Sequence, residues 1–268
     1  MTRVAAIQMT SGARVDANLA DADGLIAEAA RAGARLVVLP ENFALMVRTD
    51  AERFAAGEAD GNGPIQEFLG TAARTHGVWL VGGTIPLRAS GPKVRAACLV
   101  YDEHGQRAAR YDKIHLFDVQ LDNGENYRES NTIEPGTLPA IAETPAGRVG
   151  LAVCYDLRFP ELFRNLLDAK AEIFTIPSAF TAHTGRAHWE TLVRARAIEN
   201  LAYVIASAQG GRHANGRETH GDSMIVSPWG EILARRAHGP GVVLADIDLE
   251  HLRKVRAQLP SIDHRRIR

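Results

Sequence analysis

Short, nearly unbroken runs of apolar residues alternate with longer amphipathic segments along this 268-residue chain. The runs are rich in β-branched residues, and a run such as Leu36-Val37-Val38-Leu39 suits a strand that is covered on both faces. We expect nine strands, at residues 4–9, 35–40, 78–84, 96–101, 149–153, 173–177, 202–208, 223–226 and 242–247. Helical periodicity lies between several of them, at 16–32, 64–75, 160–169 and 188–201. This alternation predicts an α/β fold.

The arrangement of these elements predicts mixed β-sheets. Residues 223–228, followed by Trp229-Gly230 and 231–234, are typical of an antiparallel hairpin, so one fully parallel sheet is not expected. A mixed sheet, or two sheets packed together with outer helices, follows. No internal repeat, low-complexity tract or Pro/Ser-rich linker divides the chain, and we expect one domain over 1–268. The basic residues 251–268 are expected to form a C-terminal arm over the body or over a partner subunit.

Charge and composition exclude several classes of partner. The 31 basic and 32 acidic residues leave a net charge of −1, and no basic stripe is present that could bind nucleic acid. The longest uncharged stretches, 77–87 and 200–211, are shorter than the about 18 apolar residues that span a membrane. The first residues show no targeting pattern, which predicts a cytoplasmic protein. Cys98 and Cys154 form no CxxC pair or disulfide framework, and both are expected to be reduced.

Cys154 stands where the chain is expected to turn sharply from a strand to a helix. It follows the apolar run 149–153, and Pro160 is suited to open the next helix. A thiol in this position faces the positive end of a helix dipole and free backbone N–H groups, which favours the thiolate and offers a donor to an oxyanion. Alternatively, Cys154 is a small core residue, as Cys98 is expected to be.

Two further charged residues occupy positions typical of a functional site. Glu41 follows residues 36–40, at the carboxyl end of a buried strand, where α/β proteins place their sites; alternatively it is an exposed turn residue. Lys113 is framed by aromatic and aliphatic neighbours; alternatively it is a solvated loop lysine. A thiol that attacks a carbonyl also needs a base, and a Cys–His protease is a lesser alternative because Cys154 lacks a papain-like flank. Pro160 stands where a Cys-x5-Arg phosphatase needs its arginine, which excludes that class.

Together, three motifs resemble the nitrilase, or carbon–nitrogen hydrolase, superfamily. They read Pro40-Glu41-Asn42, Tyr111-Asp112-Lys113-Ile114-His115-Leu116-Phe117-Asp118 and Cys154-Tyr155-Asp156-Leu157-Arg158-Phe159-Pro160-Glu161. The resemblance extends to Gly83-Thr84-Ile85-Pro86, Glu129-Ser130 and His264-Arg265-Arg266, and so covers nearly the whole chain. It implies a four-layer αββα sandwich of two mixed β-sheets with outer helices, assembled as a homodimer.

The resemblance also implies a role for each residue of these motifs. Cys154 would be the nucleophile and Glu41 the general base that later acts as an acid. Lys113 would stabilise the tetrahedral oxyanion together with the N–H of Tyr155, and Glu129 would hold Lys113 and help to position the leaving amine. We expect this enclosure to tune the pKa of Glu41 toward neutrality, where a carboxylate best shuttles protons. No cofactor is implied.

The residues after the nucleophile favour an amidase. True nitrilases continue with Trp-Glu, whereas this chain has Tyr155-Asp156, and residues 180–200 are similar to those of the deaminated-glutathione amidases and the ω-amidases. Gln209-Gly210-Gly211-Arg212-His213 favours the former branch. The expected reaction is hydrolysis of deaminated glutathione to 2-oxoglutarate and cysteinylglycine through a thioester on Cys154. The alternatives are an ω-amidase acting on 2-oxoglutaramate or 2-oxosuccinamate, and a non-catalytic member that binds a metabolite or partner.

In that branch, the residues matching Arg158 and Thr184 contact a substrate carboxylate. A guanidinium on the first turn after the nucleophile can grip a carboxylate with two N–H bonds. Alternatively, Arg158 forms a structural ion pair with Asp156 or Glu161. Arg186 has the same ambiguity.

Two further groups of residues on or near the 188–201 helix are not expected to be functional. The histidines lack a supporting cysteine or carboxylate pattern, so no metal site is expected; they are His183, His188, His213 and His220. Trp189, Leu192, Val193 and Ile198 recur at helical spacing and are expected to pack. Relatives bury this helix between two subunits.

Overall fold

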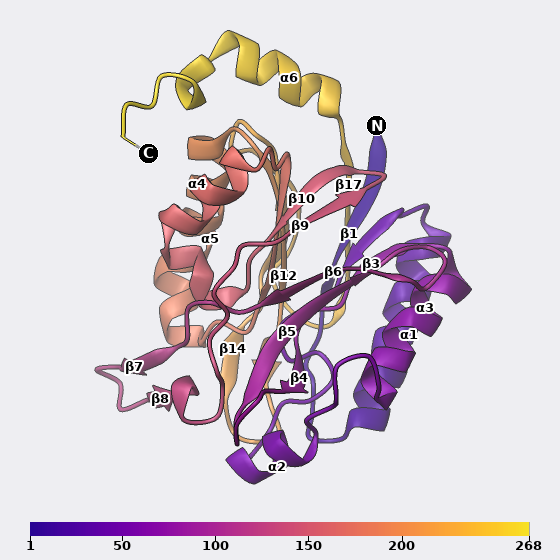
Figure 1. The fold of residues 1–268 in the computed structure, drawn as a ribbon. Coiled ribbons are helices and arrows are strands. Elements are labelled where there is room, and N and C mark those ends of the chain that lie inside the picture. Colours follow the sequence, from indigo (N-terminus) through magenta and orange to yellow (C-terminus); the bar gives the residue numbers. More distant parts are fainter. Residues whose placement is uncertain (268) are drawn as a thin grey trace.

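Two β-sheets pack face to face in the middle of the molecule, and helices cover their outer faces (Figure 1). The computed structural model describes residues 1–267. The first sheet has the order β17-β1-β2-β3-β5-β4, with β6 paired to β5. Its strands are β1 (Thr2–Gln8), β2 (Leu36–Val38), β3 (Trp79–Val81), β4 (Ile85–Arg88), β5 (Val94–Tyr101), β6 (Arg107–Asp112) and β17 (Gly241–Ile247).

The second sheet has the order β16-β15-β12-β11-β10-β9. Its strands are β9 (Ile141–Thr144), β10 (Gly147–Leu151), β11 (Ile173–Ser178), β12 (Tyr203–Ala208), β15 (Ser223–Val226) and β16 (Ile232–Arg236). Two ribbons stand apart from the sheets, β7 (Asp118–Gln120) with β8 (Asn126–Arg128), and β13 (Gly210–Arg212) with β14 (Glu218–His220). Each large sheet has parallel pairs in its centre and antiparallel pairs at its edges, so the predicted mixed sheets and the β15–β16 hairpin are confirmed.

Burial on both faces explains the nearly continuous apolar runs. In β1, Val4 and Ala6 belong to the core between the two sheets, whereas Ala5 and Ile7 pack beneath the helices of the first sheet. Successive side chains of a strand point to opposite faces, so both faces of β1 must be apolar.

Helices complete the four layers. α1 (Val15–Arg31) and α3 (Pro64–His76) cover the first sheet, and α4 (Pro160–Asp168) and α5 (Ala182–Asn200) cover the second (Figure 1). Two more helices lie outside these layers, α2 (Asp50–Ala55) against β4 and α6 (Leu249–Gln258) near the C-terminus. Short 3-10 turns occupy Glu129–Asn131, Cys154–Arg158 and Pro260–Ile262. The predicted αββα sandwich is confirmed.

Several boundaries differ from the prediction. The helix expected at 188–201 begins at Ala182, because the Thr181 side chain accepts a hydrogen bond from the Thr184 N–H and caps it. Several elements were not predicted from the sequence, namely strands β4, β6 and β9, both ribbons, and helices α2 and α6. These elements are short or carry many exposed polar residues.

The C-terminal arm lies over the body of its own chain. Its helix α6 buries Leu252 and Val255, and Arg256 donates from Nε to the Leu201 carbonyl oxygen at 2.9 Å. The last residue of the predicted arm, 268, lies outside the described residues. The single domain over 1–268 stays a prediction. Within residues 1–267, no helix combines the length and the apolar character that a bilayer crossing requires.

Candidate active site

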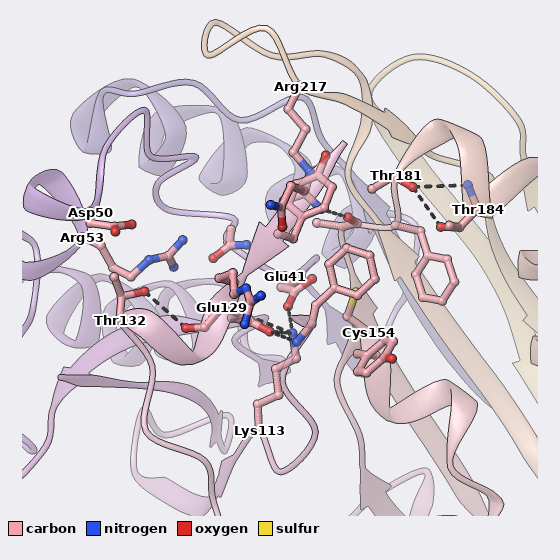
Figure 2. A pocket seen from close by; sticks show the side chains of 18 of the residues that line it. Glu41, Asp50, Arg53, Lys113, Glu129, Thr132, Cys154, Thr181, Thr184 and Arg217 are labelled. Atoms are coloured by element: carbon pink, nitrogen blue, oxygen red, sulfur yellow. Dashed lines mark hydrogen bonds and ion pairs between the residues drawn. The ribbon is translucent and has the colours of Figure 1, made fainter. Parts of the chain in front are cut away.

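A cavity of about 350 Å³ opens where strand ends of the two sheets meet, and it gathers the predicted site residues (Figure 2). Glu41 lies three residues after β2, and Lys113 directly follows β6, both in the first sheet. Cys154 lies three residues after β10 in the second sheet. The cavity is also lined by the other predicted residues, Glu129, Tyr155, Arg158 and Thr184. Segments far apart in the chain therefore converge on one volume.

Lys113 is the centre of this arrangement. Its Nζ donates to Glu41 Oε1 at 2.7 Å and to the two carboxylate oxygens of Glu129 at 3.0 and 2.9 Å (Figure 2). Lys113 is only 2% exposed. Burial alone would lower its pKa, but the carboxylates of Glu129 and Glu41 outweigh burial and raise the pKa above its ordinary value. Lys113 is thus a buried ammonium between two acids.

The charges around Glu41 and Cys154 correct two expectations. Burial would raise the pKa of Glu41, but the adjacent Lys113 ammonium lowers it overall, so the carboxylate is ionised rather than poised near neutrality. Burial, with the charge of Glu41, raises the pKa of the Cys154 thiol well above its ordinary value. The thiolate expected from a helix dipole is therefore not favoured at rest, because an anion faces the sulfur and a 3-10 turn, Cys154–Arg158, separates it from α4. A protonated thiol faces an ionised carboxylate.

The backbone at the site is held in an unusual conformation. Cys154 has φ +48° and Asn42, next to Glu41, has φ +56°, both in the left-handed region that non-glycine residues avoid. Asn42 donates its N–H to Thr84 Oγ1 at 2.9 Å. The predicted sharp turn at Cys154 is confirmed, with Pro160 opening α4.

The sequence matches the carbon-nitrogen hydrolase family over residues 3–257. The chain belongs to this family. It is 43% identical over 265 residues to a deaminated glutathione amidase of Synechocystis, covering 97% of each chain. It is 45% identical over 268 residues to a deaminated glutathione amidase of Mus musculus, covering 98% of this chain and 83% of that one.

Solved structures agree with this assignment. The fold is similar to the C. elegans NitFhit protein, with TM-score 0.91 and 36% identity over 99% of this chain. This chain spans 65% of the length of that protein. It is also similar to Saccharomyces cerevisiae Nit3, a member of branch 10 of the nitrilase superfamily, with TM-score 0.89, 30% identity and coverage of 99% and 97%. The predicted superfamily and the class of carbon–nitrogen hydrolase acting on amides are confirmed.

In this carbon–nitrogen hydrolase, the buried Asp156 ties the Cys154 turn to the Lys113 segment. Its Oδ2 accepts from the Val153 N–H at 2.8 Å and from the Tyr111 hydroxyl at 2.7 Å. Its Oδ1 accepts from the His115 N–H at 3.1 Å and lies 2.7 Å from His115 Nδ1. One carboxylate thus fixes two strand ends relative to each other. Sequence reasoning gave Asp156 no such role, although it stands inside the nucleophile motif.

The predicted substrate-contact residues differ in placement. The Arg158 guanidinium lies 5.2 Å from the Phe180 ring centroid and 5.8 Å from that of Tyr155, and it pairs with neither Asp156 nor Glu161 within residues 1–267. Thr184 is buried in the cavity lining, with its Oγ1 2.9 Å from Thr181 Oγ1. Arg186 is exposed, does not line the cavity, and has no ion pair in the described chain.

The remaining predictions near α5 are met in part. Trp189 and Val193 are buried and Leu192 is half-buried, but Ile198 is 46% exposed and does not pack in the core as expected. Cys98 lies in the core between the sheets, and burial raises its pKa to about 12. Among residues 1–267, no group of three or more His, Cys, Asp or Glu side chains is arranged to hold a metal ion.

The cavity wall includes four arginines that the sequence analysis missed, Arg48, Arg53, Arg128 and Arg217. Arg53 comes from the short helix α2, and Arg217 comes from the turn before β14. Neither stands in a recognisable motif, and only the folded chain brings them to the cavity.

Proposed function

We propose that this carbon–nitrogen hydrolase is a cofactor-free thiol amidase that hydrolyses deaminated glutathione to 2-oxoglutarate and cysteinylglycine. The observation that carries the chemistry is the buried set of Cys154, Glu41 and Lys113 in one cavity. The substrate is supported by the relatives from Synechocystis and Mus musculus, both deaminated glutathione amidases at 43% and 45% identity.

In the acylation half, the Cys154 sulfur attacks the amide carbonyl carbon and its proton passes to the Glu41 carboxylate. The raised pKa of the thiol makes this transfer necessary, and the lowered pKa of Glu41 keeps the acceptor ionised. Negative charge develops on the carbonyl oxygen, where the Lys113 ammonium and the Tyr155 N–H stabilise it. The C–N bond then breaks, Glu41 returns the proton to the leaving amine, and a thioester remains on Cys154.

In the deacylation half, water attacks the thioester carbonyl and gives a proton to Glu41. The C–S bond breaks, 2-oxoglutarate leaves, and Glu41 returns the proton to the sulfur. Glu129 holds the ammonium in place during both halves, because it accepts from Lys113 Nζ and from the Phe117 N–H at 2.7 Å. One water is consumed and every group returns to its starting state.

Arg158 and Thr184 bind the carboxylate of the acyl part in this proposal. Arg158 lines the cavity with its guanidinium near Phe180 and Tyr155, and no acidic side chain in residues 1–267 neutralises it. A planar guanidinium of this kind matches a carboxylate with two parallel N–H bonds.

The proposal includes a cytoplasmic homodimer. The nucleophile must stay reduced, and Cys98 and Cys154 are both free thiols, which a reducing compartment maintains. Ile198 of α5 and Trp229 of the β15–β16 turn are large apolar side chains that are 46% and 57% exposed, which suits contact with a second copy.

The test compares deaminated glutathione with 2-oxoglutaramate on one preparation, with Cys154→Ala and Cys98→Ala as matched variants. We expect a higher kcat/KM for deaminated glutathione, a loss of roughly 10⁴-fold in Cys154→Ala, and near-parent activity in Cys98→Ala. Mass spectrometry should find the 2-oxoglutaryl adduct on Cys154 of the parent. Parent-like turnover by Cys154→Ala would refute the mechanism. A higher kcat/KM for 2-oxoglutaramate would identify an ω-amidase instead, and no turnover of either would favour the non-catalytic binding member.

A further inference from the structure

Arg53 and Arg217 bring two guanidinium groups to the cavity wall. Both side chains are partly buried, and the Nε atom of each is buried without a hydrogen-bond partner in residues 1–267. Neither guanidinium forms an ion pair in this part of the chain. Buried charges are normally paired, so two guanidinium groups without an acidic partner in the wall of one cavity point to an anionic ligand.

The arginine of the β13–β14 turn is held firmly in position. The Arg217 guanidinium lies 5.1 Å from the Tyr127 ring centroid, and its Nη2 donates to the Ala179 carbonyl oxygen. Its charge is close enough to Glu41 to lower the pKa of that carboxyl, after Lys113. A fixed guanidinium loses little freedom when it binds an anion.

The cavity carries more positive than negative charge. Its lining includes six cationic side chains and three acidic ones, and Lys113 is already matched by two of these acids. The cationic residues are Arg48, Arg53, Lys113, Arg128, Arg158 and Arg217. Burial lowers the pKa of Arg53 most, and the charge of Arg217 lowers it further, whereas Glu129, Glu41 and Asp50 raise it. An incoming anion would relieve the repulsion between the two guanidinium groups.

The cationic groups stand on both sides of the nucleophile. In Figure 2, Thr181 and Thr184 lie beyond Cys154 on one side, while Arg53 lies beyond the Glu41–Lys113 pair on the other. Arg217 reaches into the cavity between them. The Arg158 guanidinium lies 5.2 Å from the ring centroid of Phe180, which directly precedes Thr181, so the cavity suits a molecule that has an anionic group on each side of its scissile amide. Two extended peptide residues reach about 7 Å, which is the span between the amide nitrogen and the C-terminal carboxylate of the leaving peptide.

We propose that Arg53 and Arg217 bind the C-terminal carboxylate of the leaving peptide. They select amides whose amine product is a short peptide over amides that release ammonia. This inference rests on the proposed function, because it assigns the second half of the same substrate. It also explains why Arg53 and Arg217 lie on the side of the cavity away from the acyl carboxylate.

The test uses three substrates with one acyl group: 2-oxoglutaramyl-cysteinylglycine, its C-terminal glycinamide, and 2-oxoglutaramate. The variants are Arg53→Gln and Arg217→Gln. The control is Arg212→Gln, an exposed arginine at the end of β13, across the turn from Arg217, that does not line the cavity. We expect each variant to lower kcat/KM for the acid by about 10- to 100-fold, the range for a lost charge-assisted hydrogen bond. The glycinamide and 2-oxoglutaramate should change less than about threefold, and Arg212→Gln should match the parent.

The comparison of substrates separates recognition from structural damage. In the parent, the glycinamide should be poorer than the acid by a similar 10- to 100-fold factor, and this holds even if a variant fails to fold. Equal turnover of acid and glycinamide by the parent overturns the inference while leaving the proposed function intact. An equal loss on all three substrates overturns the inference, because it assigns the arginines to the shared acyl group or to the fold. A parent that hydrolyses none of the three substrates overturns both proposals.

Discussion

Lys113 keeps the neighbouring Glu41 carboxylate ionised. Its ammonium lies 2.7 Å from Glu41, and this contact outweighs the burial that would otherwise raise the pKa of Glu41. Burial raises the pKa of the Cys154 thiol, and the Glu41 anion raises it further. A base that is ionised and a nucleophile that is protonated are the starting state that a proton transfer from sulfur to carboxylate requires.

These pKa shifts predict a broad, flat pH profile of kcat/KM. Because the pKa of Glu41 is lowered, the base is lost only as pH falls below the ordinary glutamate value of 4.5. Because the pKa of Lys113 is raised, the ammonium is lost only above the ordinary lysine value of 10.5, and no limb is expected at the ordinary thiol value of 9.0. Stopped-flow pH jumps would measure kcat/KM at each pH before the enzyme unfolds in acid. The substrate would be 2-oxoglutaramate, because it carries no thiol of its own. A limb near pH 6 to 7 would instead support the neutral Glu41 expected from sequence.

At the scale of elements, Gly83 controls the turn that presents Glu41. Gly83 has φ +56°, and a Cβ added there would lie 2.1 Å from the Pro40 carbonyl oxygen. We expect Gly83→Ala to displace Pro40 and Glu41, lowering kcat/KM by more than about 100-fold, as a misplacement near 1 Å can. Denaturant unfolding should also show a loss of several kcal/mol, since the clash adds to the about 1–2 kcal/mol of a left-handed alanine.

The matched control for this prediction is Gly77→Ala. Gly77 ends α3 with φ +62°, and no heavy atom lies within 4 Å of an added Cβ. It should lose only the conformational cost and keep the parent kcat/KM. Equal effects of the two substitutions on activity would show that contact with Pro40 does not position Glu41.

The elements with strong apolar periodicity could be predicted from sequence, and the others could not. Residues 107–112 read Arg-Ala-Ala-Arg-Tyr-Asp, and only Tyr111 is buried, so β6 has no strand pattern although it delivers Lys113. The catalytic candidates were found because long motifs flank them. Arg53 and Arg217 were missed because tertiary folding alone brings a six-residue helix without buried residues and a short turn to the cavity. The charged residue types of the site can be read from the sequence, but which charged side chains face one another depends on the fold.

At the scale of the whole molecule, the site depends on packing two sheets together. Glu41 and Lys113 belong to strand ends of the first sheet and Cys154 to the second, so neither sheet alone contains the proposed reacting groups. The helix α5 runs from the cavity to the surface. Thr184 of its first turn lines the cavity, while Ile198 near its other end is exposed.

That exposed end of α5 predicts where the proposed homodimer would form its interface. Ile198 adjoins the β15–β16 turn, where a Cβ on Gly230 would lie 2.5 Å from Ile198 Cγ1, and Trp229 of this turn is 57% exposed. Two adjacent large apolar side chains suit the buried centre of an interface, where truncating one anchor costs about 2 kcal/mol or more. In sedimentation velocity, we expect the parent to be dimeric and Trp229→Asp to weaken the dimer by at least roughly 30-fold. Leu138→Asp, at a side chain 75% exposed outside α5 and this turn, should leave the dimer unchanged. A parent that stays monomeric at micromolar concentration, or equal dissociation by both substitutions, would contradict this interface.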